Sequence, residues 1–125
     1  MPHVPVSWGE LIDKLTILEI KAERLIEAGA RANAAHEPAL LRAAAAPVPA
    51  GECAALAAEL KTLNLAQWEI EDRIRDHERD KDFGAAFVAL ARAVYRTNDA
   101  RGALKRRINL LPGSQLVEEK GYQPY

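Results

Sequence analysis

Polar side chains interrupt the apolar seams of two helices that the sequence predicts in its second half. Residues 63–71 read LNLAQWEIE and residues 95–111 read YRTNDARGALKRRINLL, with apolar residues at helical spacing on both sides of a polar centre. A guanidinium, an ammonium and several amides at such positions have the chemistry to hold a carboxylate or a phosphate. The candidate ligand-binding residues are Asn64, Gln67, Glu71, Asn98, Arg101 and Lys105.

The two interruptions coincide if the helices form an antiparallel hairpin. Both helices rise about 1.5 Å per residue, so residues equally distant from a turn at Lys81 lie side by side, and Asn64 faces Asn98. Charge favours the same hairpin, because residues 51–82 carry nine acidic and five basic side chains, whereas residues 83–125 carry three acidic and seven basic ones. The sequence therefore predicts one shared polar layer inside the hairpin.

The layer has a structural interpretation, in which it fixes the register and the antiparallel pairing of the two helices. Burying Arg101 without an acidic partner would be costly, and either Glu71 or Asp13 could provide that partner within the chain. The structural interpretation is favoured for this reason.

An alternative interpretation makes the layer a binding or catalytic site for a small anionic metabolite, such as a phosphorylated or carboxylated sugar. Arg101 and Lys105 would clamp the negative charge, and Glu71 would act as a general acid or base. The three amides of the layer would orient the ligand. No catalytic signature occurs elsewhere in the chain, so the sequence leaves catalysis open and favours a protein that is not an enzyme.

The rest of the sequence predicts an all-α fold, in which an N-terminal helix packs along the antiparallel hairpin to make a bundle of three to four helices. Ser7 precedes the first helix and Asp82 the last, and both are suited to cap the N–H groups of a first turn. Pro112 and Gly113 end the last helix. The expected elements are helices at about residues 8–28, 38–46, 52–79 and 83–111, and an ordered, irregular C-terminal tail at residues 112–125.

The first predicted helix is apolar on two faces. One stripe includes Leu11 and Leu18, while Ile17 and Ile20 lie on the opposite side together with Asp13. Such a helix is either central in its bundle or buried by another chain, and we expect a homodimer through the face that carries the two isoleucines. The candidate interface residues are Ile17, Ile20, Tyr122 and Tyr125.

Composition indicates a single domain, residues 1–125. The chain has 49% hydrophobic residues and a formal net charge of −1, so the total charge does not favour nucleic acid or an anionic membrane as a partner. The single cysteine, Cys53, excludes an internal disulfide, and the three histidines are too widely spaced for a zinc motif, so we expect no metal and no cofactor. The N-terminus lacks signal-peptide features and no apolar run is long enough to span a membrane, which favours a cytoplasmic location.

Four blocks of sequence are specific in combination: VSWGELIDKLTILEIK, WEIEDRIRD, LARAVYRTNDARGALKRRINLL and GSQLVEEKGYQPY. Together they resemble an uncharacterised bacterial family that is known as a domain of unknown function. Members of that family are associated with genes for glycosyltransferases and surface polysaccharides, so the resemblance implies a supporting role in glycan assembly with a protein partner. No catalytic residue is assigned in the family, and none is carried over. We therefore expect a helical accessory or adaptor protein that acts through protein–protein association.

Overall fold

The computed structural model describes residues 2–24 and 51–111, which form three α-helices. The described residues contain no strand, so the predicted all-α fold is confirmed. The helices are α1, Trp8–Arg24, α3, Glu52–Asp80, and α4, Ala85–Asn109. Each predicted end that falls within the described ranges agrees with the structure to within two residues. The predicted helix at 38–46, the last residues of the first predicted helix and the tail with Tyr122 and Tyr125 lie outside the described residues.

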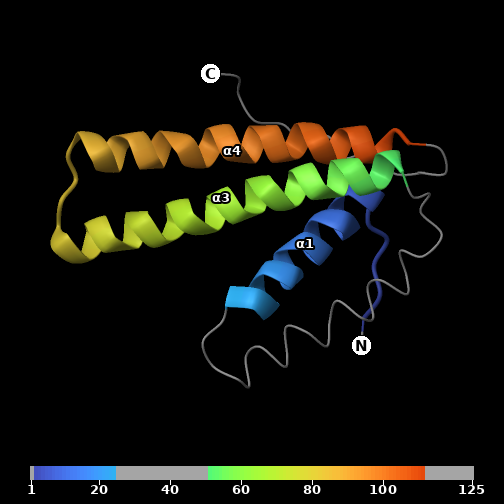
Figure 1. The fold of residues 1–125 in the computed structure, drawn as a ribbon, viewed down its shortest axis with the longest axis horizontal. Coiled ribbons are helices and arrows are strands. Elements are labelled where there is room, and N and C mark those ends of the chain that lie inside the picture. Colours follow the sequence, from blue (N-terminus) through green and yellow to red (C-terminus); the bar gives the residue numbers. More distant parts are fainter. Residues whose placement is uncertain (1, 25–50, 112–125) are drawn as a thin grey trace.

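The long helices α3 and α4 form the antiparallel hairpin that the sequence predicts (Figure 1). Lys81 ends α3 in the left-handed conformation, with φ 53°, and the N–H of Asp82 donates to the carbonyl of His77 at 2.9 Å. The prediction that Asp82 caps α4 is wrong, because Gly84 occupies the N-cap position and the side chain of Asp82 accepts from the Gly84 N–H at 3.2 Å. That contact stabilises the turn between the helices.

Helix α1 approaches the end of the hairpin where the last turns of α4 lie. Ser7 caps α1 as predicted, since its hydroxyl accepts from the N–H of Glu10 at 3.2 Å. One turn of α1 lies so close to α4 that a side chain at Gly9 would overlap the backbone carbonyl of Lys105. The N–H of Gly9 donates instead to the side-chain oxygen of Asn109 at 2.7 Å. Glycine is therefore required at this position by the close approach of two backbones.

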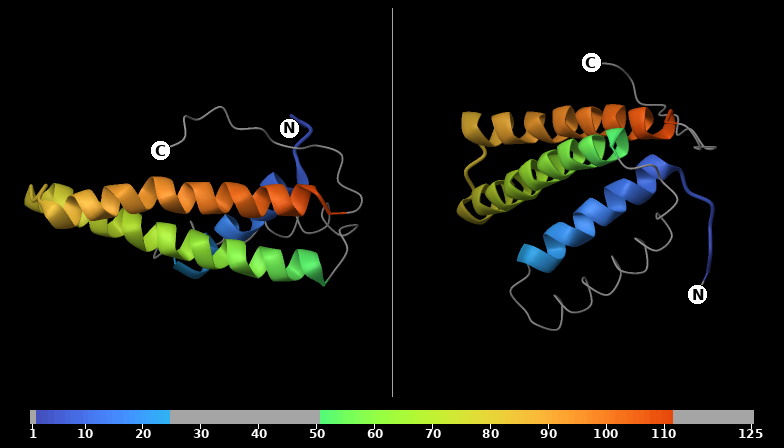
Figure 2. Two further views of the ribbon diagram at one scale, coloured as in Figure 1. Left: turned by 90° about the horizontal axis from the view of Figure 1, so that it is seen from above. Right: turned by 45° about the vertical axis from the view of Figure 1, so that its right-hand side comes forward.

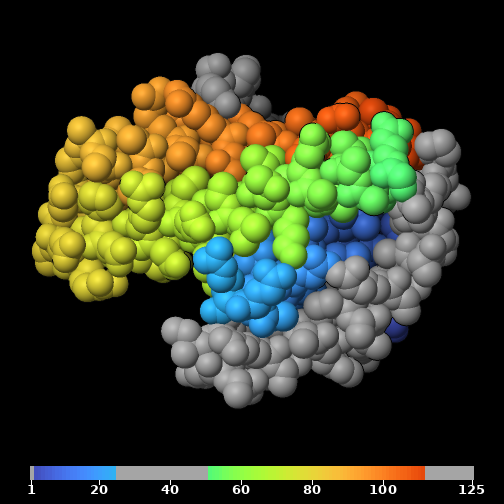
Figure 3. Space-filling model, viewed as in Figure 1, coloured from blue at the N-terminus to red at the C-terminus, as the bar shows by residue number. Residues whose placement is uncertain are grey.

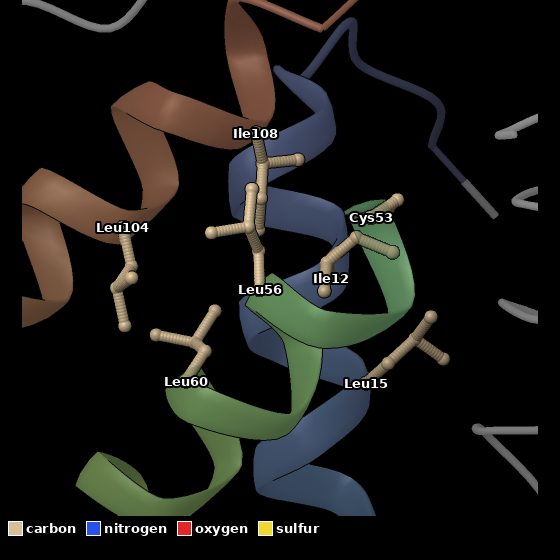
Figure 4. Packing of buried hydrophobic residues seen from close by; sticks show 7 residues of the cluster. All are labelled: Ile12, Leu15, Cys53, Leu56, Leu60, Leu104 and Ile108. Atoms are coloured by element: carbon tan, nitrogen blue, oxygen red, sulfur yellow. The ribbon is translucent and has the colours of Figure 1, made fainter. Parts of the chain in front are cut away.

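The hydrophobic core fills the space between α1 and the near half of the hairpin (Figure 4). Leu60 is completely buried, and Leu56 and Ile108 are almost completely buried. Cys53 belongs to the same cluster, and burial raises the pKa of its thiol because the thiolate would lose its hydration. The buried residues of the cluster are Ile12, Leu15, Cys53, Leu56, Leu60, Leu104 and Ile108.

Among the described residues, only α3 and α4 form the far end of the hairpin, residues 70–95, which we call the distal hairpin. Helix α1 has 17 residues and α3 has 29. At about 1.5 Å per residue, α1 is roughly 25 Å long and α3 is about 43 Å long, so α1 is too short to follow α3 over its whole length. Figures 1 and 2 show that the hairpin extends well beyond the last turn of α1. Phe83, Val88 and Tyr95 are accordingly 50%, 51% and 41% exposed.

The second apolar face of α1 is buried within the chain itself. Ile20 is only 1% exposed, so it is not available as an interface residue, and that part of the predicted dimer surface is wrong. Ile17 is half-buried. The burial of Ile20 therefore favours burial of this face within the chain over burial by another chain.

Candidate functional site

The carboxylate of Asp13 is the centre of the polar layer. Its Oδ2 accepts from Nη2 of Arg101 at 2.7 Å, and its Oδ1 accepts from Nδ2 of Asn64 at 2.8 Å. The ammonium of Lys105 lies 3.9 Å from Oδ2. Because the Asp13 side chain is only 4% exposed, it brings a buried negative charge from α1 against both helices of the hairpin.

Further hydrogen bonds fix the groups around that carboxylate. The Asn64 amide also donates to the hydroxyl of Thr16 at 2.7 Å, and that hydroxyl donates to the backbone carbonyl of Asp13 at 2.8 Å. On the opposite side, Nη1 of Arg101 donates to Oδ1 of Asn98 at 2.8 Å. The buried groups Asp13, Thr16 and Asn64 are thereby paired with one another, as is usual for polar groups away from water, whereas Asn98 is exposed.

Lys105 has a second acidic partner. Its ammonium lies 2.6 Å from Oε2 of Glu10 in the first turn of α1, and its side chain is 9% exposed. Asp13 and Glu10 lie three residues apart, so both acids project from one side of α1 toward α4. The pairing explains how α4 accommodates a buried lysine close to the part-buried Arg101.

The structure brings together four of the six predicted layer residues. Asn64, Asn98, Arg101 and Lys105 are connected through Asp13 or through Arg101. Asn64 is buried and bonds to α1, whereas Asn98 is exposed and bonds to Arg101 on its own helix, so the predicted pairing of Asn64 with Asn98 is not among the hydrogen bonds of the described residues. The acid that pairs with Arg101 is Asp13, one of the two alternatives that the sequence left open.

The other two predicted residues lie beside the network. Glu71 is 43% exposed and faces Arg75 on the same helix, with 3.7 Å between Oε2 and Nη2. Gln67 is half-buried, and no hydrogen bond involves its Oε1. Together with Asn64 and Arg101, these side chains line a groove.

The groove lies where the end of α1 diverges from the hairpin. Its volume is about 420 Å³, and Figure 3 shows the surface hollowed between the light-blue end of α1 and the yellow-green part of α3. Ile17, Ile20 and Lys21 line the side formed by α1. Trp68 and Asp72 add an indole and a second carboxylate from α3. We call this space the α1–α3 groove.

Two buried polar atoms at the α1–α3 groove have no hydrogen-bond partner. They are Oε1 of Gln67, an acceptor, and Nε of Arg101, a donor. A buried polar group without a partner costs about 1–3 kcal/mol of stability. The amide nitrogen of Asn109 is also unpaired, but Asn109 does not line this groove.

Sequence reasoning did not identify the contributions of Thr16 and Asn109, and it did not decide the role of Asp13. The residues Asp13, Thr16, Ile17 and Ile20 recur at intervals of three and one, so they share a face of α1. That mixed polar and apolar face was the available signal. Asn109 gave no signal, because its importance arises from the close approach of Gly9.

The described residues do not bring together a metal site or a membrane span. No group of three His, Cys, Asp or Glu residues converges within residues 2–24 and 51–111. In the same ranges no helix is both long enough and apolar enough to cross a bilayer. The chemistry of the site is therefore that of a buried ion-pair network with a polar and aromatic groove beside it.

Comparison with known proteins identifies the family. Residues 2–125 match the model described as "Family of unknown function (DUF6165)". The chain belongs to this family. The match covers nearly the whole sequence, including all three described helices, so the DUF6165 model corresponds to the entire bundle. No curated protein and no solved structure matches the chain.

Proposed function

We propose that this DUF6165 protein is an accessory or adaptor protein that acts by association of helical hairpins, and that it forms a homodimer. The observation that carries the proposal is the distal hairpin, where no third helix among the described residues covers α3 and α4. Ile70, Ile74 and Val94 are only half-buried there, and Leu90 is the one buried hydrophobic residue. A second hairpin on this end would complete a four-helix bundle.

Charge favours a second copy of the chain as the occupant of the distal hairpin. Helix α3 carries eight acidic and four basic residues, whereas α4 carries one acidic and six basic residues. Only one ion pair between the helices, Arg107 with Glu59 at 3.8 Å, is seen in the described structure, and it lies at the opposite end. In a two-fold dimer, the acidic α3 of each copy would lie beside the basic α4 of the other copy. The favourable contact between opposite charges would therefore occur twice in each dimer.

The pathway in this proposal comes from the sequence resemblance, which associates such proteins with surface-polysaccharide assembly. In that setting a cytoplasmic dimer would present its surface to a protein of the pathway. Glu71 has no role in the proposal, since an exposed acid beside an arginine is common on helix surfaces.

The proposal is tested by the mass of the protein in solution. The native chain is expected to have twice its mass of 13.7 kDa, and Val88→Glu should return it to the monomer. Val6→Glu is the matched control, because Val6 is 48% exposed but lies before α1. A native protein that remains monomeric at all concentrations would refute self-association.

One further variant, Ile17→Glu, distinguishes the α1 face from the distal hairpin as the interface. If Ile17→Glu dissociates the dimer and Val88→Glu does not, the α1 face is the interface and the distal hairpin is not. In the source organism, replacement by Val88→Glu should reduce the surface polysaccharide, whereas Val6→Glu should leave it unchanged. Equal polysaccharide in both strains would contradict the assigned pathway.

A further inference from the structure

We propose that the α1–α3 groove binds a small hydroxylated ring that carries one negatively charged group, either a carboxylate or a phosphate. The groove has a volume of about 420 Å³, which lies within the range of roughly 300–1,000 Å³ that is usual for small-molecule sites. Glu71, Asp72 and Arg75 of the distal hairpin contribute to its lining, but Val88 does not, so the Val88→Glu test of self-association is separate from this proposal.

Two residues that line the groove, Gln67 and Arg101, carry buried polar atoms without a partner among the described residues, and these atoms indicate a hydroxyl group. Oε1 of Gln67 accepts hydrogen bonds and Nε of Arg101 donates one, and neither has a partner. A hydroxyl both donates and accepts, whereas a carboxylate only accepts, so a hydroxyl is the group that satisfies both atoms. Both atoms are covered by protein, so the proposal requires the Gln67 side chain to turn toward the groove and uncover them.

Lys21 supplies the charge that a negatively charged group requires. Two other cations line the groove, but Arg101 is paired with Asp13 and Arg75 faces Glu71. Lys21 forms no ion pair with any residue that the structure describes, and it is half-buried in the wall formed by α1. An anion at Lys21 therefore gains a partner without displacing an existing ion pair.

The remaining walls suit a ring with apolar and polar edges. Trp68 and Ile17 line the groove and are half-buried, so both can pack against the apolar surface of a ring. Asp72 lines it as well and accepts from the ring's hydroxyl groups. An indole, exposed carboxylates and a cation without an ion pair among the described residues together favour a hydroxylated anion over a purely apolar ligand.

The test uses the two indole N–H signals of the native protein in a ¹H–¹⁵N spectrum. Glucuronate and glucose 6-phosphate are the charged probes, and glucose and inorganic phosphate are the matched controls that lack the charge or the ring. At about 10 mM, a probe with a Kd near 1 mM should shift the signal of Trp68 and leave that of Trp8 in place. At least one charged probe should bind ten-fold more tightly than both controls. Tighter binding of glucuronate would identify a carboxylate as the preferred negative group, and tighter binding of glucose 6-phosphate would identify a phosphate.

Variants connect that shift to the groove. Lys21→Gln should weaken binding of the charged probe at least ten-fold, whereas Lys14→Gln, at an exposed position two turns earlier on α1 that does not line the groove, should leave it unchanged. Gln67→Met should weaken binding while circular dichroism shows the native helix content. If no probe shifts Trp68, or if inorganic phosphate binds as tightly as glucose 6-phosphate and glucuronate does not bind, the proposal is overturned.

Discussion

The two ends of the α3–α4 hairpin are built from the same pair of helices, yet they are stabilised differently. At the near end, α1 adds a third layer, so that Leu60 is completely buried and the carboxylate of Asp13 pairs with Arg101. At the distal end, Phe83 and Val88 are half exposed and only Leu90 is buried among the apolar residues. The difference shows that α1, and not the hairpin sequence alone, determines where this protein has a core.

The largest expected effect comes from the charge at the centre of the near end. Asp13→Asn removes the buried carboxylate and leaves the part-buried guanidinium of Arg101 without its acid, which should lower the free energy of unfolding by about 3 kcal/mol. Urea unfolding followed by circular dichroism measures the change. Asp99→Asn, an exposed change on α4, is the control and should have little effect. A loss below about 1 kcal/mol would mean that the network does not hold α1 in place.

The next prediction compares equivalent apolar truncations at the two ends. Leu60→Ala should cost about 2–5 kcal/mol, because it opens a cavity among buried neighbours. Ile74→Ala, at a half-buried position of the distal hairpin, should cost about 1 kcal/mol in the monomer. Both values come from urea unfolding in the Val88→Glu background. Equal losses would contradict the contrast between the ends.

Gly9 tests whether the close approach of α1 to α4 is required. In Gly9→Ala the added Cβ would overlap the Lys105 carbonyl and come within 2.9 Å of Oδ1 of Asn109, so we expect a loss of about 1–3 kcal/mol despite the higher helix propensity of alanine. Gly84→Ala is the control, because its Cβ would meet nothing closer than 3.4 Å. The midpoints of thermal unfolding give the comparison. Stabilisation by Gly9→Ala would show that the helices separate at little cost.

The smallest effect is expected for the surface ion pairs between α1 and α3. Lys61 lies 3.2 Å from Glu19 and 3.0 Å from Glu23, and all three side chains are partly exposed to solvent. Lys61→Gln should therefore cost only about 0.2–1 kcal/mol, and added salt should reduce the difference from the native protein. Urea titrations at low and high salt measure it. A loss as large as that of Asp13→Asn would show that surface charge, and not the buried network, attaches α1.

Much of the fold could be predicted from the sequence, because its signals are local. Apolar spacing located α3 and α4, and equal rise per residue gave the height at which Asn64 and Arg101 interrupt the two seams. The cap at Ser7 was also readable, since the residue type and the start of the apolar pattern agree. These features depend on neighbours within a few residues or on one assumed turn.

The rest depends on how α1 crosses the hairpin, which no local pattern specifies. Asp13 and Ile20 share a face that looked like a dimer surface until the crossing placed both inside the chain. The same crossing decides that Asp13, and not Glu71, pairs with Arg101. The way in which α1 crosses the hairpin, together with side-chain packing, also decides whether a polar residue joins the network or lies beside the groove, as Gln67 does.

The buried thiol of Cys53 makes the near end chemically observable. Thiol reagents attack the thiolate, and burial both covers the sulfur and raises its pKa, so the folded protein should react slowly. Because Cys53 is the single cysteine and lies at the start of α3, its rate of modification measures how often α1 and α3 separate there. The protein thus carries its own label for local opening, at the end where its core lies and away from the end we propose for self-association.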